Sequence, residues 1–226
     1  MAASAFNLKN MDFERARFNM IEQQIRPWDV LDQDVLDLLG AVKREDFVPA
    51  AYRSLAFTDM DIPLPGGESM LSPKLEGRLL QELSVRKHEW VLEVGTGSGY
   101  FAALLGHRSA HVLSLEIHPD LAETAQHNLR QAGVMNATVR CMDASKELPP
   151  GEFDAIVLSG SVAQIPDALV QRLKPGGRLC AIVGQAPMMR AQLLSRTGAL
   201  ESKVVDLFDT MAPRLHGFPD APHFRF

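Results

Sequence analysis

The stretch that decides the fold is residues 91–100, which read VLEVGTGSGY. Apolar residues around Glu93 are followed by three glycines that alternate with Thr96 and Ser98. This pattern is typical of a buried strand that ends in a tight turn and leads into a helix. Glycines in such a turn let the backbone approach a ligand closely, so the stretch predicts a cofactor site at the end of a strand.

The spacing of the glycines disfavours two common nucleotide sites. A dinucleotide-binding turn of the form G-x-G-x-x-G that starts at Gly95 needs glycine at position 100, where this chain has Tyr100. The phosphate-binding loop needs Gly-Lys followed by Ser or Thr, and the sequence contains no such run. A dinucleotide-dependent oxidoreductase is therefore the weakest of the functions considered.

Acidic residues at the ends of successive predicted strands favour S-adenosylmethionine instead. A carboxylate at Glu93 would repel a pyrophosphate but suits the ammonium group of this cofactor. Glu116, 21 residues beyond Gly95, is placed to accept hydrogen bonds from ribose hydroxyls, and Asp143 is placed to meet the adenine amine. Capping of strand ends would explain one such acid better than three. The candidate cofactor residues are Glu93, Gly95, Thr96, Gly97, Ser98, Gly99, Glu116, Ile117, Asp143 and Ala144.

Strand-like and helix-like segments alternate after residue 88, which predicts an α/β fold with a parallel sheet. We expect a Rossmann-like S-adenosylmethionine-dependent methyltransferase fold. Its mostly parallel seven-stranded sheet would have helices on both faces and an N-terminal helical extension. The whole chain, 1–226, is expected to form a single domain. Within it, 1–85 would supply N-terminal helices and a substrate loop, 86–185 the cofactor-binding core, and 186–226 C-terminal strands and a tail.

Composition and charge limit the classes of binding partner and the cellular location that we expect. The 226 residues carry a formal net charge of −5, which argues against a nucleic-acid partner. No apolar stretch approaches the roughly 20 residues of a membrane span, and the N-terminus lacks the pattern of a signal peptide, so we expect a cytoplasmic protein. We expect Cys141 and Cys180 to be buried thiols and the protein to be a monomer or weak homodimer. The seven histidines show no metal-ligand spacing, so no metal site is expected.

Beyond the cofactor turn, the sequence resembles the protein-L-isoaspartate O-methyltransferases over about residues 17–184. The segments that carry the resemblance are MIEQQIR (20–26), REDFVPAAYRSLAF (44–57), VLEVGTGSGYFAALL (91–105) and FDAIVLSGSVAQIPDALVQRLKPGGRL (153–179). The cofactor turn is shared with other methyltransferases, whereas the N-terminal segments and the end of the last segment are more specific. The resemblance implies methylation of isoaspartyl carboxylates in damaged proteins or peptides, which is a protein-repair activity that yields S-adenosylhomocysteine.

The substrate loop departs from the family pattern. The family has Gly-Gln-Thr-Ile-Ser-Gln-Pro where this chain has GESMLSP, residues 67–73. Ser69 stands at the threonine position, but Leu71 stands where the family has a serine that is taken to orient the isoaspartyl carboxylate. Ser69 and Ser72 are therefore the candidate substrate-orienting residues, and capping of the helix that starts near Pro73 is an equally good reading of both.

Three functions fit these features. The first is a carboxyl methyltransferase acting on isoaspartyl residues, and the second is a methyltransferase whose acceptor is a small metabolite, which the altered loop would permit. The third is a catalytically weak cofactor-binding module with a regulatory role. Only turnover on defined acceptors separates the three.

Overall fold

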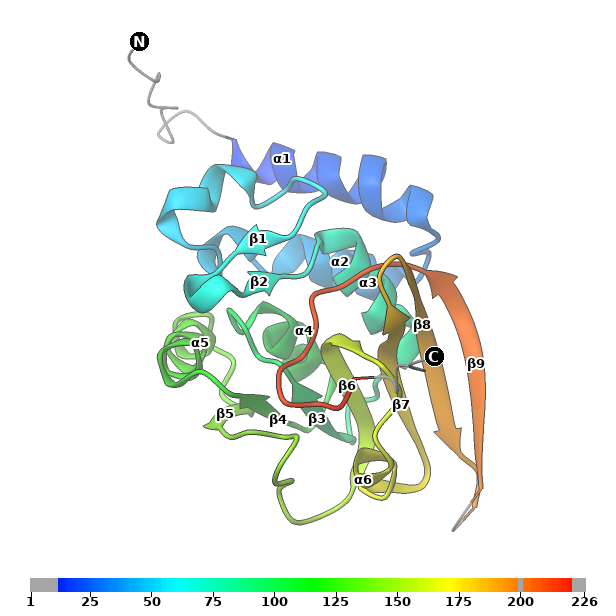
Figure 1. Ribbon diagram of the computed structural model, residues 1–226. Helices are drawn as coiled ribbons and strands as arrows, with labels where there is room; N and C mark the ends of the chain where they lie inside the picture. The colour runs from blue at the N-terminus through cyan, green and yellow to red at the C-terminus, as the bar shows by residue number, and fades with distance from the viewer. Residues whose placement is uncertain (1–11, 199–200, 221–226) are drawn as a thin grey trace.

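The computed structural model describes residues 12–198 and 201–220 and is built around a seven-stranded sheet (Figure 1). The strand order is β5-β4-β3-β6-β7-β8-β9, in which β5 to β7 are mutually parallel and β8 is antiparallel to both of its neighbours. The predicted mostly parallel sheet is confirmed. The bounds are β3 Trp90–Val94, β4 His111–Glu116, β5 Ala137–Cys141, β6 Phe153–Val162, β7 Leu173–Gln185, β8 Met188–Arg196 and β9 Ser202–Asp209.

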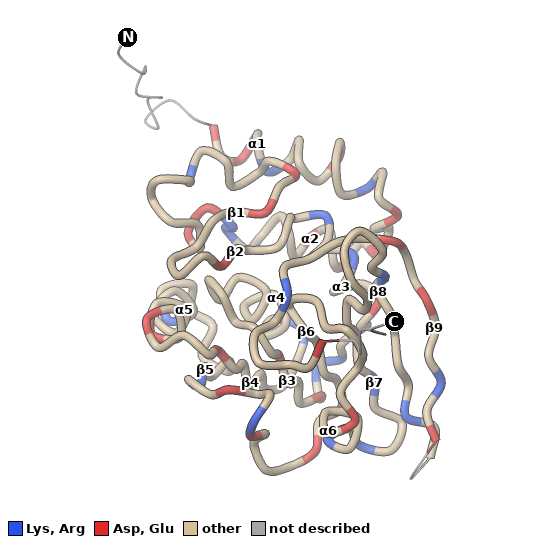
Figure 2. The backbone as a smooth tube through the Cα atoms, viewed as in Figure 1, with Lys and Arg blue, Asp and Glu red and all other residues tan. Residues whose placement is uncertain are grey.

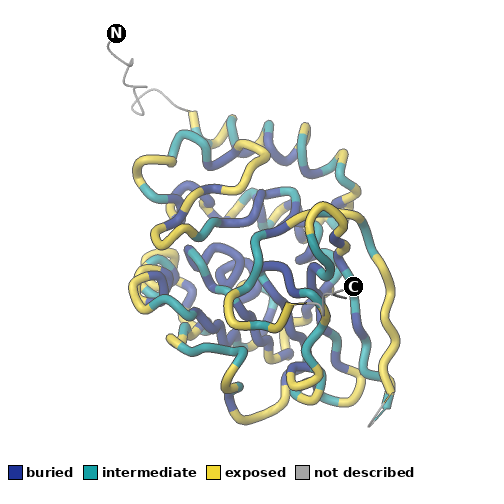
Figure 3. The backbone as a smooth tube through the Cα atoms, in the orientation of Figure 1, coloured by how far each residue is buried: buried dark blue, intermediate teal, exposed yellow. Residues whose placement is uncertain are grey.

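The central strands are buried on both faces, as their nearly continuous apolar sequences predict. Val91 and Leu92 are each completely buried, yet they belong to separate hydrophobic clusters on opposite faces of the sheet. Figure 3 shows the same arrangement, with dark central strands and a largely exposed outer strand β9. In Figure 2, both signs of charge are interspersed along α1 and β9.

Helices cover the two faces unequally. The helices are α1 Phe13–Met20, α2 Gln33–Ala41, α3 Pro73–Leu83, α4 Tyr100–Arg108, α5 Pro119–Gln131 and α6 Asp167–Val170, and a turn of π-helix, Ile21–Ile25, extends α1. Side chains of α1 to α5 belong to one hydrophobic cluster, whereas Leu169 of α6 belongs to the other. Helix α6 is short because Leu173 already pairs with Phe153, so the chain is extended there.

The N-terminal region shares its hydrophobic cluster with the sheet. Met20, Leu39 and Leu79 are almost fully buried and belong to the same cluster as Val91 and Ile182. This packing favours the expected single domain, which stays a prediction. Part of that range, 1–11 and 221–226, lies outside the described residues. Across the described part of the chain, no helix is both long and apolar enough to cross a membrane.

The topology fixes where a ligand can bind. The chain order reverses between β3 and β6, and open α/β sheets bind ligands beyond the carboxyl ends of the strands at such a reversal. After β9 the chain turns back across this edge, as the red segment in Figure 1 shows. It is held to β6 by a short parallel bridge between Ser161 and Arg214, in which the Leu215 N–H donates to the Ser161 carbonyl at 2.9 Å.

Candidate functional site

The glycine turn is shaped by backbone conformation and close packing. Gly95 and Gly99 have φ values of 94° and 87°, in the region that side chains disfavour. A Cβ at Gly99 would lie 3.1 Å from the Ala125 carbonyl oxygen, so glycine also allows α4 to begin against α5. The Gly95 N–H donates to the Leu115 carbonyl at 2.8 Å, which ties the turn to the neighbouring strand. The turn is therefore anchored to the sheet.

Glu93 is completely buried beneath this turn. Ser114 Oγ donates to its Oε2 at 2.6 Å and Ser159 Oγ donates to its Oε1 at 2.8 Å, while Ser114 Oγ is 2.6 Å from Thr96 Oγ1. Burial is the main cause that raises the pKa of Glu93 to about 8, although the two serine hydroxyls oppose it. A buried carboxyl of this kind is poised to ionise when a cation such as an ammonium group comes close.

The other two predicted acids lie at the ends of β4 and β5. Glu116 Oε2 accepts the Gly97 N–H at 2.9 Å and Oε1 accepts the His118 N–H at 3.1 Å, so its carboxylate also braces the turn. Asp143 accepts the Ser145 hydroxyl at 2.6 Å and pairs with Lys146 at 2.8 Å. The hydrogen bond from Lys146, followed by that from Ser145, lowers the pKa of Asp143. Both acids are therefore hydrogen-bond acceptors at the strand ends.

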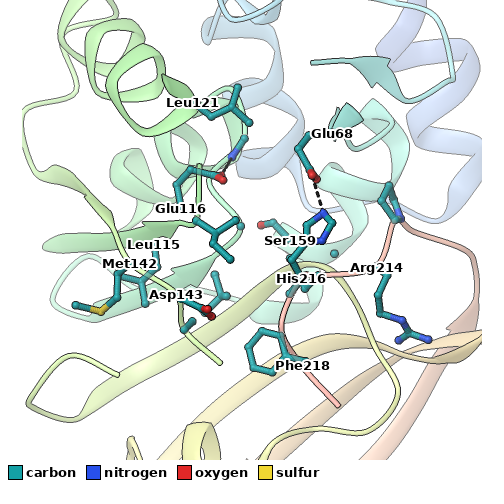
Figure 4. A pocket seen from close by; sticks show the side chains of 18 of the residues that line it. Glu68, Leu115, Glu116, Leu121, Met142, Asp143, Ser159, Arg214, His216 and Phe218 are labelled. Atoms are coloured by element: carbon teal, nitrogen blue, oxygen red, sulfur yellow. Dashed lines mark hydrogen bonds and ion pairs between the residues drawn. The ribbon is translucent and has the colours of Figure 1, made fainter. Parts of the chain in front are cut away.

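Most of the predicted cofactor residues line one cavity, shown in Figure 4. The space between its walls, including the part that is open to solvent, is about 610 Å³. The predicted residues that line it are Ser69, Gly95, Gly97, Glu116, Ile117, Asp143 and Ala144. Leu115, Met142 and Phe218 supply apolar walls near Asp143. Carboxylates and apolar walls together suit a ligand with ribose and adenine parts.

Glu93, Thr96 and Ser98 line a smaller adjacent cavity that also includes Leu71. The two cavities share Ser69, Gly95, Gly97 and Ser159, so they meet at the glycine turn. A cofactor whose ammonium group reached Glu93 would pass from the larger cavity into the smaller one. Thr96 and Ser98 are each 4% exposed and form part of the turn, and Gly99 is the N-cap residue of α4.

The structure separates the candidate substrate residues. Ser69 lies in β2 Ser69–Met70, which pairs with β1 Ile62–Pro63, and it lines both cavities. Ser72 lines a different groove, beside Trp28 and Met188, and makes no side-chain cap hydrogen bond although it occupies the N-cap position of α3. The capping interpretation is therefore wrong for Ser72. Leu71 is 4% exposed and faces the smaller cavity.

Arg44 fixes the substrate loop and was not singled out from the sequence. It is fully buried and pairs with Glu76, and its Nη2 donates to the Leu71 carbonyl at 2.7 Å while its Nε donates to the Ala56 carbonyl at 3.0 Å. The guanidinium also lies 4.9 Å from the centre of the Tyr100 ring. These contacts join the backbone at Ala56 and at Leu71 of the substrate loop to α3 and α4. The one sequence feature that concerns Arg44 is its position at the start of segment 44–57, which resembles the family.

The C-terminal residues that line the pocket could not be predicted from the sequence. Pro213, Arg214, Leu215, His216 and Phe218 all line the larger cavity. The side chain of Leu215 reaches the turn so closely that a Cβ at Gly95 would lie 2.8 Å from its Cδ2. These residues lie beyond the stretch, about 17–184, over which the sequence resembles the family.

The cysteines differ from expectation in one case. Both are free thiols, and Cys180 is buried as predicted, but Cys141 is exposed. The reason is that Cys141 ends β5, which is one of the two edge strands of the sheet.

Comparison with known proteins agrees with this architecture. The profile of the family described as "Protein-L-isoaspartate(D-aspartate) O-methyltransferase (PCMT)" matches residues 15–209. A protein-L-isoaspartate O-methyltransferase of Methanoculleus marisnigri is 37% identical over 190 residues, which cover 83% of this chain and 86% of the relative. One from Brucella anthropi is 33% identical over 208 residues, 91% of this chain and 95% of the relative.

A solved structure shows the same fold. The putative protein-L-isoaspartate O-methyltransferase of Plasmodium falciparum, in complex with S-adenosyl-L-homocysteine, superimposes with a TM-score of 0.76 at 18% identity. The match covers 91% of this chain and 98% of that one. By its sequence matches over most of its length, this chain belongs to the protein-L-isoaspartate(D-aspartate) O-methyltransferase family.

Proposed function

We propose that this chain transfers a methyl group from S-adenosylmethionine to the side-chain carboxylate of isoaspartyl residues in damaged proteins or peptides. The observation that carries the proposal is the cavity lined by Gly95, Gly97, Glu116 and Asp143, in a member of this family. Its two free thiols fit a reducing cytoplasm as the place of action.

The residues present fit the cofactor. Glu116 would accept hydrogen bonds from the ribose hydroxyls, Asp143 would accept one from the adenine amine, and Glu93 would pair with the ammonium group. Gly95 and Gly97 leave room for the backbone to approach the methionine part. When bound, S-adenosylmethionine supplies a methyl group on a positively charged sulfur.

The chain itself must position the acceptor and exclude water. A side-chain carboxylate is already ionised at pH 7, so the transfer needs no general base. Holding the acceptor oxygen in line with the methyl group can supply much of the rate enhancement. Ser69 and Ser159 both line the two cavities, but the Ser159 hydroxyl already donates to Glu93, which leaves the Ser69 hydroxyl for the acceptor. We propose that Ser69 is the orienting hydroxyl of this site.

The test is methyl transfer to an isoaspartyl peptide, compared with the same peptide carrying normal aspartate. We expect transfer to the isoaspartyl peptide and none above background to its twin. Ser69→Ala should lower the rate on the isoaspartyl peptide more than Ser72→Ala, because Ser72 lines a separate groove. Cofactor binding with no transfer to either peptide would contradict the proposal and favour a regulatory cofactor-binding module.

A second candidate function has one specific observation in its favour. Leu71 lines the cavity that Glu93 and Ser159 also line, and the family pattern has a hydroxyl at this position. Such a wall suits an acceptor less polar than a peptide carboxylate. A small-molecule methyltransferase is therefore the alternative, and transfer to small carboxylic acids or alcohols in place of the isoaspartyl peptide would establish it.

A further inference from the structure

Three side chains able to ligate a metal meet at the rim of the larger cavity. Glu68 precedes β2, His118 precedes α5 and His216 lies in the C-terminal segment. One ligand atom of each lies within 4.8 Å of those of the other two. Figure 4 shows the Glu68 carboxylate and the His216 ring facing each other. The expectation of no metal site rested on local spacing, which cannot detect residues brought together from three separate segments.

The distances in this Glu68–His118–His216 cluster suit a small divalent ion. Glu68 Oε1 lies 3.2 Å from His118 Nε2 and 2.7 Å from His216 Nε2. Donor atoms of a tetrahedral Zn²⁺ site lie about 2.0–2.2 Å from the ion, so they are about 3.3 Å from each other. The His118 contact already has this separation. The His216 ring, whose side chain is 58% exposed, would have to withdraw by only about 0.6 Å to reach it.

The orientation of the rings and the charges of the cluster also favour a metal site. The two imidazole rings are nearly perpendicular, at 84° with centroids 5.7 Å apart, and both direct Nε2 at the same carboxylate oxygen. Within the described residues, Glu68 forms ion pairs only with these two histidines, so no lysine or arginine occupies its carboxylate. Two imidazoles and one carboxylate favour a borderline transition metal over Ca²⁺ or Mg²⁺.

We propose that Glu68, His118 and His216 bind one divalent ion of the Zn²⁺ class, with the remaining coordination open to water. Three protein ligands and one open position are a usual set for Zn²⁺. Glu68 and His216 both line the cofactor cavity. The ion would therefore join the turn before β2 to the C-terminal segment and fix the rim of the cavity. The proposal does not depend on which acceptor the enzyme methylates.

The experiment uses the full chain, stripped with a chelator that is then removed. We expect competition with a chromophoric chelator to show one equivalent of bound Zn²⁺, and Co²⁺ to give the strong visible absorption of a four-coordinate site. Glu68→Gln, His118→Gln and His216→Gln should each weaken Zn²⁺ binding at least about tenfold, the lower end of what losing even an outer-shell partner costs. His88→Gln is the matched control, because His88 is an exposed histidine before β3, at the far end of that strand.

Thermal unfolding separates loss of the site from loss of the fold. Zn²⁺ should raise the melting temperature of the wild type and of the His88 variant, because a ligand that binds only the folded state stabilises it. It should not raise that of the cluster variants, whose curves in chelator report their own folding. Wild-type protein that takes up no equivalent of Zn²⁺ would overturn the proposal. So would cluster variants that bind it as tightly as the control, and the cluster would then be a hydrogen-bonded contact only.

Discussion

Leu71→Ser should raise the rate of isoaspartyl methylation while it lowers the stability of the protein. Leu71 faces the cavity that holds Glu93 and Ser159, so a hydroxyl at this position would point toward the acceptor. An acceptor carboxylate that enters the site loses water and needs donors in its place. One hydrogen bond to a charged group is worth about 1.5–3 kcal/mol. If the bond forms in the transition state, the expected gain is about ten- to a hundredfold in rate.

The stability cost follows from the burial of the same side chain. Leu71 is 4% exposed and belongs to the hydrophobic cluster that joins the N-terminal helices to the sheet. Removing a buried leucine side chain typically costs about 2–5 kcal/mol. A hydroxyl left without a partner when no substrate is bound adds to this cost. The backbone should hold its position, because Arg44 contacts the Leu71 carbonyl rather than its side chain.

Leu71→Ala is the control that separates these effects, because it removes the same side chain without adding a hydroxyl. The assay is the initial rate with an isoaspartyl peptide at saturating cofactor, at a temperature well below both melting transitions. Cofactor affinity, measured by calorimetry, should be nearly equal in the two variants. Equal rates for the serine and alanine variants would refute the reasoning, as would wild-type protein that already works as fast as an efficient enzyme.

Three further predictions concern the cofactor half and the buried ion pair. Glu116→Ala should weaken S-adenosylmethionine binding by about 1.5–3 kcal/mol in calorimetry, because two charge-assisted hydrogen bonds to the ribose are lost; unchanged affinity would remove Glu116 from the site. Burial penalises the ionised form of Glu93 and raises its pKa to about 8. The stability that depends on the protonated form is therefore fully present below the ordinary pKa near 4.5 and is lost as the pH rises through about 8. Because an ammonium group pairs with the ionised carboxyl, cofactor affinity should rise between pH 6 and 8 by up to about tenfold per unit, and Glu93→Gln should bind more weakly with no such slope. Arg44→Met should lower stability by about 3–5 kcal/mol because it leaves Glu76 buried without its partner, and the double variant with Glu76→Leu should recover much of the loss; chemical denaturation that shows no recovery would contradict this.

The fold could be predicted because its signals are local. The carboxyl ends of parallel strands meet at one edge of a sheet, so acids that follow successive strands must come together. Glu116 and Asp143 accordingly line one cavity with Gly95. The same logic placed Glu93 near the cofactor, but the sequence could not show that Ser114 and Ser159 occupy both of its oxygens. Those partners come from neighbouring strands, and only the strand order reveals them.

The rest of the site depends on contacts that have no local pattern. His216 meets Glu68 across 148 residues of sequence, and Arg44 reaches the Leu71 carbonyl across 27. A single polar residue in a loop carries no periodicity, so nothing in its neighbourhood predicts its partner. The exposure of Cys141 is missed for a related reason, since a strand's own sequence does not state whether it lies at the edge of the sheet.

The way the two halves of the site are held explains why one half can diverge without the other. The glycine turn is hydrogen-bonded to the backbone of β4, and Glu116 braces it from the same strand, so the turn is tied to the sheet. The substrate loop is held instead through backbone carbonyls by Arg44. Side chains such as Leu71 can therefore change while the loop keeps its path. Since methyl transfer to an ionised acceptor depends on alignment rather than on an acid or base, such a change alters which acceptor is aligned and leaves the chemistry available.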